Sequence, residues 1–481
     1  MNLSLRYICL LSLVTMTGCK KYLDAPLPVN EITTAAVYTT DNGSAAALNS
    51  VYDAVYAEGL FDGAGSVGYL TSLYGDELIN LNSLPNPTAV YEDGVSSSLG
   101  GVTGLWSEIY AQLYSINLAI ENLPSQSTTA VPHKNQWLGE AYFVRGLFYF
   151  YLTNMYGTVP LVLSSNYSAN NTLARSSQQV VYAQIVADLK QAQTLLVDNY
   201  YDATGATTSD RGRPNRMAAS AMLAKAYLYT GDWKDAEAQA DSAIGDATDY
   251  QLTDPLQTFL IGSKEIIWGI EPDGSGSVAY LEKDVATYYI VNGNYPTNAN
   301  VYVYLSDSLV DAFEPGDLRY TDWVGKDTVP ASGTTAAAVY PYAYKFQAYG
   351  SFTQPVEFVP FCRLGEQYLI RAEARAEQNE LAGAASDLNV IRTRATLPVT
   401  TAVTQNDLLS AIARERRVEL FCEMGNRFFD LRRTGTLNAL MTNVAVQKGG
   451  TWNSDGYQQW WPIPLTDVEN DTHLTQTPGY Q

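Results

Sequence analysis

The chain has 481 residues, with 29 Lys and Arg against 50 Asp and Glu, and its formal net charge at pH 7 is −21. This acidity argues against nucleic acid or an anionic bilayer surface as partner, because both repel negative charge. With only two histidines, a His-rich metal site and His-based catalysis are disfavoured. A single core rarely exceeds about 300 residues, so the length predicts several domains or stacked units.

The first 18 residues have the features of a secretory signal peptide. Arg6 supplies a positive charge, and the short apolar stretch Tyr7–Met16 follows it. Small residues before Cys19 resemble a bacterial lipobox, in which this cysteine becomes the acylated N-terminus. No later segment offers about 18 uninterrupted apolar residues, so we expect the mature protein to lie outside the membrane, held by its lipid.

Two cysteines remain once the signal peptide and the lipidated cysteine are set aside. Cys362 and Cys422 each have apolar neighbours in the sequence. Buried free thiols are the favoured interpretation, with a disulfide between them as the alternative.

The first half of the chain shows helical periodicity. The segment Leu105–Leu123 has one broad apolar face and ends before Pro124. Gln136–Tyr156 is apolar nearly all round, which predicts a helix buried in a large protein. Tyr182–Leu196 is amphipathic, with apolar residues at helical spacing.

Two later segments, Met217–Ile244 and Leu369–Ile391, resemble each other at fixed spacing. Gly231 and Asn379 occupy equivalent positions, and apolar residues follow each of them at the same offsets. Both residue types suit a left-handed turn, and small alanines allow close helix approach. This pattern predicts helix–turn–helix units of the tetratricopeptide type.

Two regions break the helical pattern. Gly59–Gly104 is rich in Gly, Ser, Asn and Pro, and Asp246–Pro360 contains short β-like runs, including Glu265–Ile270 and Tyr340–Phe346. Long insertions of this kind are often functional. We therefore expect loops and small sheets laid over a helical solenoid.

Catalytic and nucleotide-binding motifs are weak or missing in the sequence. The GxGxxG match at Gly63–Gly68 lacks a preceding strand, so it is interpreted as a flexible loop. A pair of carboxylates for glycoside hydrolysis is left open by the composition, but no spacing singles one out. The charge-rich stretches 414–419 and 427–433 favour internal salt bridges over a phosphate-binding patch.

Tyrosine and tryptophan residues in the loop regions have two interpretations. At helical spacing they predict core packing, whereas in loops they can stack on the apolar face of a sugar ring. Each stack would contribute on the order of 1 kcal/mol, because a sugar covers only part of one ring face. Several stacks predict weak binding of an extended ligand.

The sequence contains a set of motifs spread over the whole chain. They are Cys19–Asp24, the spaced residues Trp106, Tyr110 and Asn117, Glu140–Arg145, Tyr156–Leu161, Arg363–Ala376, Glu415–Phe421, Glu423–Gly435, Trp461–Pro464 and Gln476–Tyr480. Together these motifs are similar to those of the SusD/RagB outer-membrane lipoproteins of the Bacteroidetes. Gly365, Met424, Asn426 and Thr477 depart from the usual pattern of that family.

The resemblance implies a mainly α fold within one SusD-like domain, residues 19–481. About four tetratricopeptide-like repeats would form a right-handed scaffold, approximately 105–244 and 361–435. A loop-rich part with short strands, approximately 59–104 and 246–360, would bind ligand. The implied role is capture of an oligosaccharide at the cell surface and delivery to a SusC-like TonB-dependent outer-membrane transporter, without catalysis, cofactor or metal.

We expect the ligand contacts to lie in the two loop regions and at the mouth of the fourth repeat. Asp76 is placed where the family often has an acid that bonds sugar hydroxyls. The expected contacts are Tyr69, Tyr74, Asp76, Tyr91, Tyr289, Tyr295, Tyr302, Trp323 and Arg363.

Two other classes of function remain open. A tetratricopeptide adaptor lipoprotein would bind peptide or protein, and a flat apolar groove would favour it. A glycosidase would need two carboxylates about 5–9.5 Å apart in a cleft.

Overall fold

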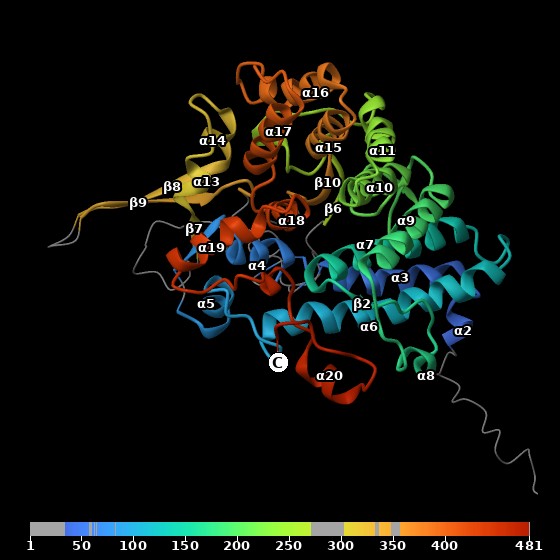
Figure 1. Cartoon of the computed structure of the whole chain (residues 1–481). Coiled ribbons are helices and arrows are strands. Elements are labelled where there is room, and N and C mark those ends of the chain that lie inside the picture. Colours follow the sequence, from blue (N-terminus) through green and yellow to red (C-terminus); the bar gives the residue numbers. More distant parts are fainter. Residues whose placement is uncertain are drawn as a thin grey trace, which may run out of the picture.

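Figure 1 shows the computed structural model of the chain, which describes residues 34–56, 60–61, 63, 65–81, 83–270, 303–331, 336–347 and 356–480. Within these residues the protein is mainly helical, and its strands are short. No helix in this part of the chain combines the length and the apolar character that crossing a membrane requires.

The scaffold is a row of helices in which each helix packs against the next one in chain order (Figure 1). The inserted segment between α11 and α15 does not interrupt the row, because these two helices pack directly on each other. The row consists of α6 (Gly100–Asn122), α7 (Lys134–Tyr156), α9 (Gln178–Leu195), α10 (Arg216–Thr230), α11 (Trp233–Gly245), α15 (Leu364–Glu377), α16 (Leu381–Arg394) and α17 (Gln405–Glu419).

The two similar sequence segments form helix–turn–helix units, as their spacing predicts. Gly231 joins α10 to α11 in the left-handed conformation, at φ +76°, and Asn379 joins α15 to α16 at φ 63°. Ala236 and Ala240 of α11 are fully buried, as is Ala384 of α16. Small side chains at these positions let the paired helices approach closely, so the prediction of tetratricopeptide-like repeats is confirmed.

Helix α7 is buried on nearly all sides, as its apolar sequence predicts. Its one buried arginine, Arg145, joins three helices. The guanidinium pairs with Asp188 of α9 at 2.7 Å and donates a hydrogen bond to Asn117 Oδ1 of α6 at 3.0 Å. These contacts satisfy the buried charge and fix the relative position of α6, α7 and α9.

Shorter helices surround the row. Helix α3 packs against α6 and α7, and α18 packs against α4 and α19. These helices are α2 (Thr34–Val37), α3 (Asp41–Tyr56), α4 (Val67–Tyr74), α5 (Pro85–Tyr91), α8 (Tyr167–Asn170), α13 (Asp307–Val310), α14 (Leu318–Trp323), α18 (Asn426–Arg433), α19 (Leu437–Gln447) and α20 (Leu465–Asn470), with 3-10 turns η3 (Leu123–Ser125), η4 (Pro255–Gln257) and η5 (Tyr457–Gln459).

The described strands pair antiparallel in twos, outside the helical row. The pairs are β1 (Leu78–Asn80) with β7 (Val303–Leu305), β2 (Val159–Pro160) with β3 (Arg175–Ser176), β4 (Tyr200–Tyr201) with β5 (Thr207–Thr208), β6 (Ile266–Ile270) with β10 (Val359–Arg363), and β8 (Val324–Val329) with β9 (Ala338–Ala343). Both β-like runs expected from the sequence therefore contain strands.

The region 59–104 holds more helix than its composition indicates. Ser66 caps α4 by accepting a hydrogen bond from the Tyr69 amide, and Pro85 stands at the first position of α5. Every residue of α4 is buried. Glycine and proline therefore mark helix boundaries in this region, where the sequence analysis expected loops.

Cys362 and Cys422 are buried free thiols, as expected. Burial raises the pKa of both thiols, because a thiolate is poorly solvated in the core. These cysteines belong to the packing of the core.

Candidate ligand-binding site

Three aromatic residues expected to contact ligand lie in the core. Tyr69 is 2% exposed, and Tyr74 and Trp323 are fully buried. The Tyr74 hydroxyl donates to the Gln458 carbonyl at 2.8 Å, and the Trp323 indole N–H donates to the Pro255 carbonyl at 2.8 Å. The expectation that these rings contact a glycan is therefore corrected, because all three rings are covered and the polar hydrogens of Tyr74 and Trp323 are bonded inside the protein.

Asp76 is also interior. Its carboxylate accepts hydrogen bonds from Arg417 at 2.8 Å and from Arg427 at 2.9 and 3.0 Å. Burial opposes ionisation, but the Arg427 hydrogen bond and the charges of both arginines outweigh it and lower the pKa of Asp76. The predicted sugar contact is thus replaced by a structural ion pair.

Arg363 lies inside a buried network of charges and not at the mouth of a repeat. It contacts Glu423 at 2.8 Å, Glu265 at 3.0 Å and Glu419 at 2.5 Å. Burial alone would lower the pKa of Arg363, but these three carboxylates raise it well above its usual value. The network joins β10 to α17, and it leaves this guanidinium unavailable to a ligand.

Four of the sequence-predicted residues cannot be placed. Tyr289, Tyr295, Tyr302 and Cys19 lie outside the described residues. Tyr91, at the C-terminal end of α5, is half-buried and keeps part of its ring at the surface.

Half-buried tyrosines gather on the hairpin formed by β8 and β9. Tyr340, Tyr342 and Tyr344 alternate with their neighbours, so they share one face of the strand and its continuation. The Tyr342 and Tyr344 rings are perpendicular, with centroids 5.8 Å apart. The backbone of Gly325 lies opposite Tyr342 across the hairpin, and the Tyr342 ring occupies the space that a side chain there would need.

A fourth tyrosine joins this face from a separate sheet. Tyr304 lies on β7, opposite Ile79 of β1, and β7 contacts β9. The Tyr304 ring meets the Tyr340 ring edge to face, with centroids 5.3 Å apart. The pairing with β1 anchors Tyr304 to the segment that follows α4.

Tyr91 lies beside these tyrosines. Half-burial raises its pKa to about 12, and the nearby Tyr304 adds to the shift. The Lys448 ammonium lies 5.1 Å from the Tyr91 ring centroid and forms an ion pair with Asp93 at 3.2 Å. The contact fixes one side of the ring. We call Tyr91, Tyr304, Tyr340, Tyr342 and Tyr344 the tyrosine face.

The tyrosine face has the chemical groups that sugar recognition needs. Burial, together with Tyr344 and Asp327, raises the pKa of Tyr342, so this hydroxyl stays a donor at neutral pH. Asp327 pairs with Tyr340 across the hairpin, and its buried Oδ2 has no hydrogen-bond partner in the described structure. Rings, hydroxyl donors and an acidic acceptor therefore lie within one surface.

The sequence analysis missed four of these five tyrosines. The alternation Tyr340-x-Tyr342-x-Tyr344 was visible as a β-like run, and a period of two places such residues on one face. Tyr304 carried no comparable signal, because its neighbour Tyr340 is distant in the sequence.

Comparison with known proteins identifies the class to which this fold belongs. The profile of the SusD family matches residues 164–480, and a profile described as "Starch-binding associating with outer membrane" matches residues 34–228. The chain belongs to the SusD family.

Two relatives and one solved structure illustrate the similarity. SusD-like protein P2 of Formosa agariphila is 25% identical, over 97% of this chain and 98% of its own. The starch-binding protein SusD of Bacteroides thetaiotaomicron is 26% identical, over 71% and 72% of the two chains. A laminarin-binding SusD-like protein superposes with a TM-score of 0.73 at 23% identity, covering 92% of this chain and all of its own.

Proposed function

We propose that this protein captures a glycan at the cell surface through the tyrosine face and delivers it to a SusC-like TonB-dependent outer-membrane transporter. The observation that carries the proposal is the convergence of five half-buried tyrosines from α5, β7 and the β8–β9 hairpin. Starch and laminarin, named for a relative and for a structural neighbour, make glucans the first ligands to test.

The expected affinity is modest. Two or three stacked rings at about 1 kcal/mol each, with a few hydrogen bonds, place the dissociation constant between about 10 µM and 1 mM. A long polymer offers many such sites, so capture depends on repeated weak contacts.

The tyrosine face is tested by titrating maltooligosaccharides and laminarioligosaccharides into wild-type and Tyr340→Ala protein in a calorimeter. We expect a loss of about fivefold or more in affinity, because the half-buried Tyr340 ring meets Tyr304 edge to face near the centre of the tyrosine face. Tyr167→Ala is the matched control, since this ring is 73% exposed on α8 and belongs to no cluster described above. Equal affinity in all three proteins would refute the role of Tyr340.

The protein is proposed to bind without cutting. The buried carboxylates described above, Asp76, Glu265, Glu419 and Glu423, are each occupied by arginine. Recovery of a glucan unchanged in length after prolonged incubation is expected, and steady shortening by purified protein would contradict a binding role.

The N-terminal anchor is a separate part of the proposal. Acylated Cys19 would hold the protein to the outer membrane, which agrees with the description of the matching profile. Cys19→Ser should move the protein from the membrane fraction to the soluble fraction, and unchanged membrane association would contradict the anchor. Co-purification of the solubilised protein with a TonB-dependent transporter tests the proposed partner.

A peptide-binding adaptor is the alternative within the same scaffold. Titration of mixed peptides alongside the glycans separates the two, because half-buried tyrosine rings beside an acidic acceptor favour sugars. Saturable binding of peptides and of no glycan would favour the adaptor.

A further inference from the structure

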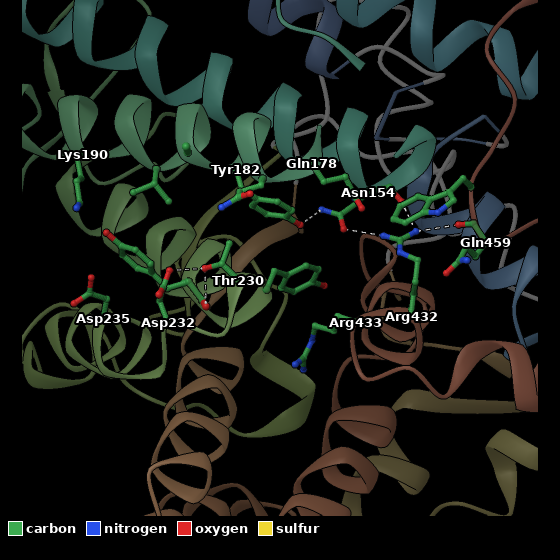
Figure 2. A pocket seen from close by; sticks show the side chains of 16 residues that line it. Asn154, Gln178, Tyr182, Lys190, Thr230, Asp232, Asp235, Arg432, Arg433 and Gln459 are labelled. Carbon is green, nitrogen blue, oxygen red and sulfur yellow. Dashed lines mark hydrogen bonds between the residues drawn. The ribbon is translucent and has the colours of Figure 1, made fainter. Parts of the chain in front are cut away.

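A second concave site lies in the helical row. A cleft of about 850 Å³ opens between α9 and α10, and Arg432 and Arg433 at the end of α18 close one end together with Gln459 (Figure 2). This volume falls within the range of small-molecule sites, about 300–1,000 Å³. In Figure 1, α9 and α10 lie well away from β8 and β9, so the cleft is distinct from the tyrosine face.

One end of the cleft is built around Arg432. Its guanidinium lies 4.0 Å from the Trp460 ring centroid. It donates hydrogen bonds to the carbonyls of Asn154 and Gln459, at 2.5 and 3.2 Å, and to Asn154 Oδ1 at 2.8 Å (Figure 2). The Trp460 indole packs directly against the backbone of Gly157, where a side chain would place its Cβ 3.1 Å from the indole. This end of the cleft is therefore rigid before any ligand arrives.

Arg432 carries a charge that its surroundings do not neutralise. No carboxylate of the described residues forms an ion pair with it, whereas its neighbour Arg433 pairs with Glu373 and Asp430. Burial lowers the pKa of Arg432 to about 10, still leaving it cationic at neutral pH. A guanidinium has five N–H donors, and three hydrogen bonds are accounted for above. An anionic ligand would supply the negative charge that Arg432 lacks as a partner, and it would accept hydrogen bonds from the remaining N–H groups.

The rest of the cleft offers polar groups suited to a hydroxylated ligand. Tyr229 lines the cleft, and its buried hydroxyl has no hydrogen-bond partner within the described structure. Gln178 lies near the Arg432 end, and Asp232 and Asp235 lie at the opposite end (Figure 2). Carboxylates are strong acceptors for sugar hydroxyls, and Lys190 adds an ammonium donor at the same end of the cleft (Figure 2).

We propose that this cleft is a second ligand site, which takes an acidic oligosaccharide with a uronate carboxylate on Arg432 and neutral hydroxyls toward Asp232 and Asp235. The net charge of −21 does not preclude such a ligand. Exposed charges beyond about 8 Å are largely screened at physiological ionic strength, so the local guanidinium dominates.

The first test compares acidic ligands with matched neutral ones at physiological salt. The probes are trigalacturonate, trimannuronate and a glucuronate-bearing xylotriose, each beside the same oligosaccharide with its carboxyl groups reduced to alcohols. We expect at least one acid to bind about tenfold or more tighter than its reduced form. No preference for any acid over its reduced form would overturn the proposal.

Variants then assign that binding to the cleft. Ala183 is exposed on α9 and lines the cleft, so Ala183→Trp should fill it and lower the affinity for the acid about tenfold. Ala187→Trp places the same side chain at an exposed position of the same helix outside the lining, and it should bind like wild type. Arg432→Gln should equalise the acid and its reduced form.

A variant of the tyrosine face separates this proposal from the proposed function. The double variant Tyr304→Ala/Tyr340→Ala should keep the affinity for the acidic oligosaccharide while losing the neutral glucan. If Ala183→Trp left acidic binding intact, or if the double variant abolished it, the second site would be refuted whatever the fate of glucan binding.

Discussion

At the scale of single residues, Glu77 makes folding depend on pH. Burial raises its pKa to about 7 from 4.5, although Ser72 donates to it at 2.7 Å. Between about pH 4.5 and pH 7 the folded protein keeps a proton on Glu77 that the unfolded chain has lost. The contribution of Glu77 to stability is therefore greatest below this window, falls as pH rises through it, and is level above it.

Replacing Glu77 with a residue that does not titrate tests this pH dependence. Glu77→Gln should add about 1–3 kcal/mol to the free energy of unfolding at pH 8 and change it little at pH 4.5. Urea denaturation across this pH range measures the difference. Glu469→Gln, an exposed position, is the control and should follow wild type. A constant difference between Glu77→Gln and wild type at all pH values would contradict this account.

Asp76 allows a prediction about buried ion pairs. Asp76→Asn leaves Arg417 and Arg427 facing each other without their shared carboxylate. We expect a loss of about 3 kcal/mol in stability at pH 7, because breaking a buried pair leaves charge uncompensated. Thermal unfolding measures it. A glycan contact at Asp76 would instead predict weakened binding with unchanged stability.

At the scale of elements, the helix–helix turns test the repeat structure. Gly231 adopts a left-handed conformation with no contact closer than 3.5 Å to an added Cβ, so only backbone strain opposes alanine there. Gly231→Ala should cost about 1 kcal/mol, while Asn379→Gly should cost a few tenths or less. The denaturation midpoints give both values, and a neutral Gly231→Ala would contradict the left-handed turn.

The β8–β9 hairpin gives a prediction about binding. An alanine at Gly325 would displace the Tyr342 ring from the hairpin. We expect Gly325→Ala to weaken glycan affinity about threefold to tenfold, the equivalent of one stack, with little change in melting temperature. Gly104→Ala is the control, because an added Cβ there meets no atom within 4 Å, and its glycan affinity should equal that of wild type. Gly316 is unsuitable as a control, because its φ of +87° would strain an alanine. Unchanged affinity in Gly325→Ala would remove Tyr342 from the site.

The helical elements could be predicted from sequence, while the site largely could not. The spacing of apolar residues and the identity of turn residues are local signals, and they predicted α7 and both helix–turn–helix units. Tyr74 and Trp323 are buried by residues far along the chain, since Tyr74 packs on Trp461 and Trp323 on Phe259. Composition alone could not distinguish these rings from Tyr304 and Tyr340, which remain partly open.

At the scale of the whole molecule, the fold carries the tyrosine face on segments outside the helical row. The row from α6 to α17 supplies a rigid frame, and the inserted segment between α11 and α15 carries β7, β8 and β9 to one side of it (Figure 1). Family membership accounts for the frame. The tyrosine face proposed above lies outside the helical row, so we expect specificity for neutral glucans to follow these tyrosines and not the repeats.

The central claim is that the tyrosine face holds a polysaccharide. Native electrophoresis through gels cast with starch or laminarin measures this directly, since a bound protein is retarded. We predict that wild-type protein is retarded by at least one of these glucans, and that Tyr304→Ala/Tyr340→Ala runs as it does in a gel without polysaccharide. Equal retardation of the wild type and the double variant, with both folded, would contradict the account.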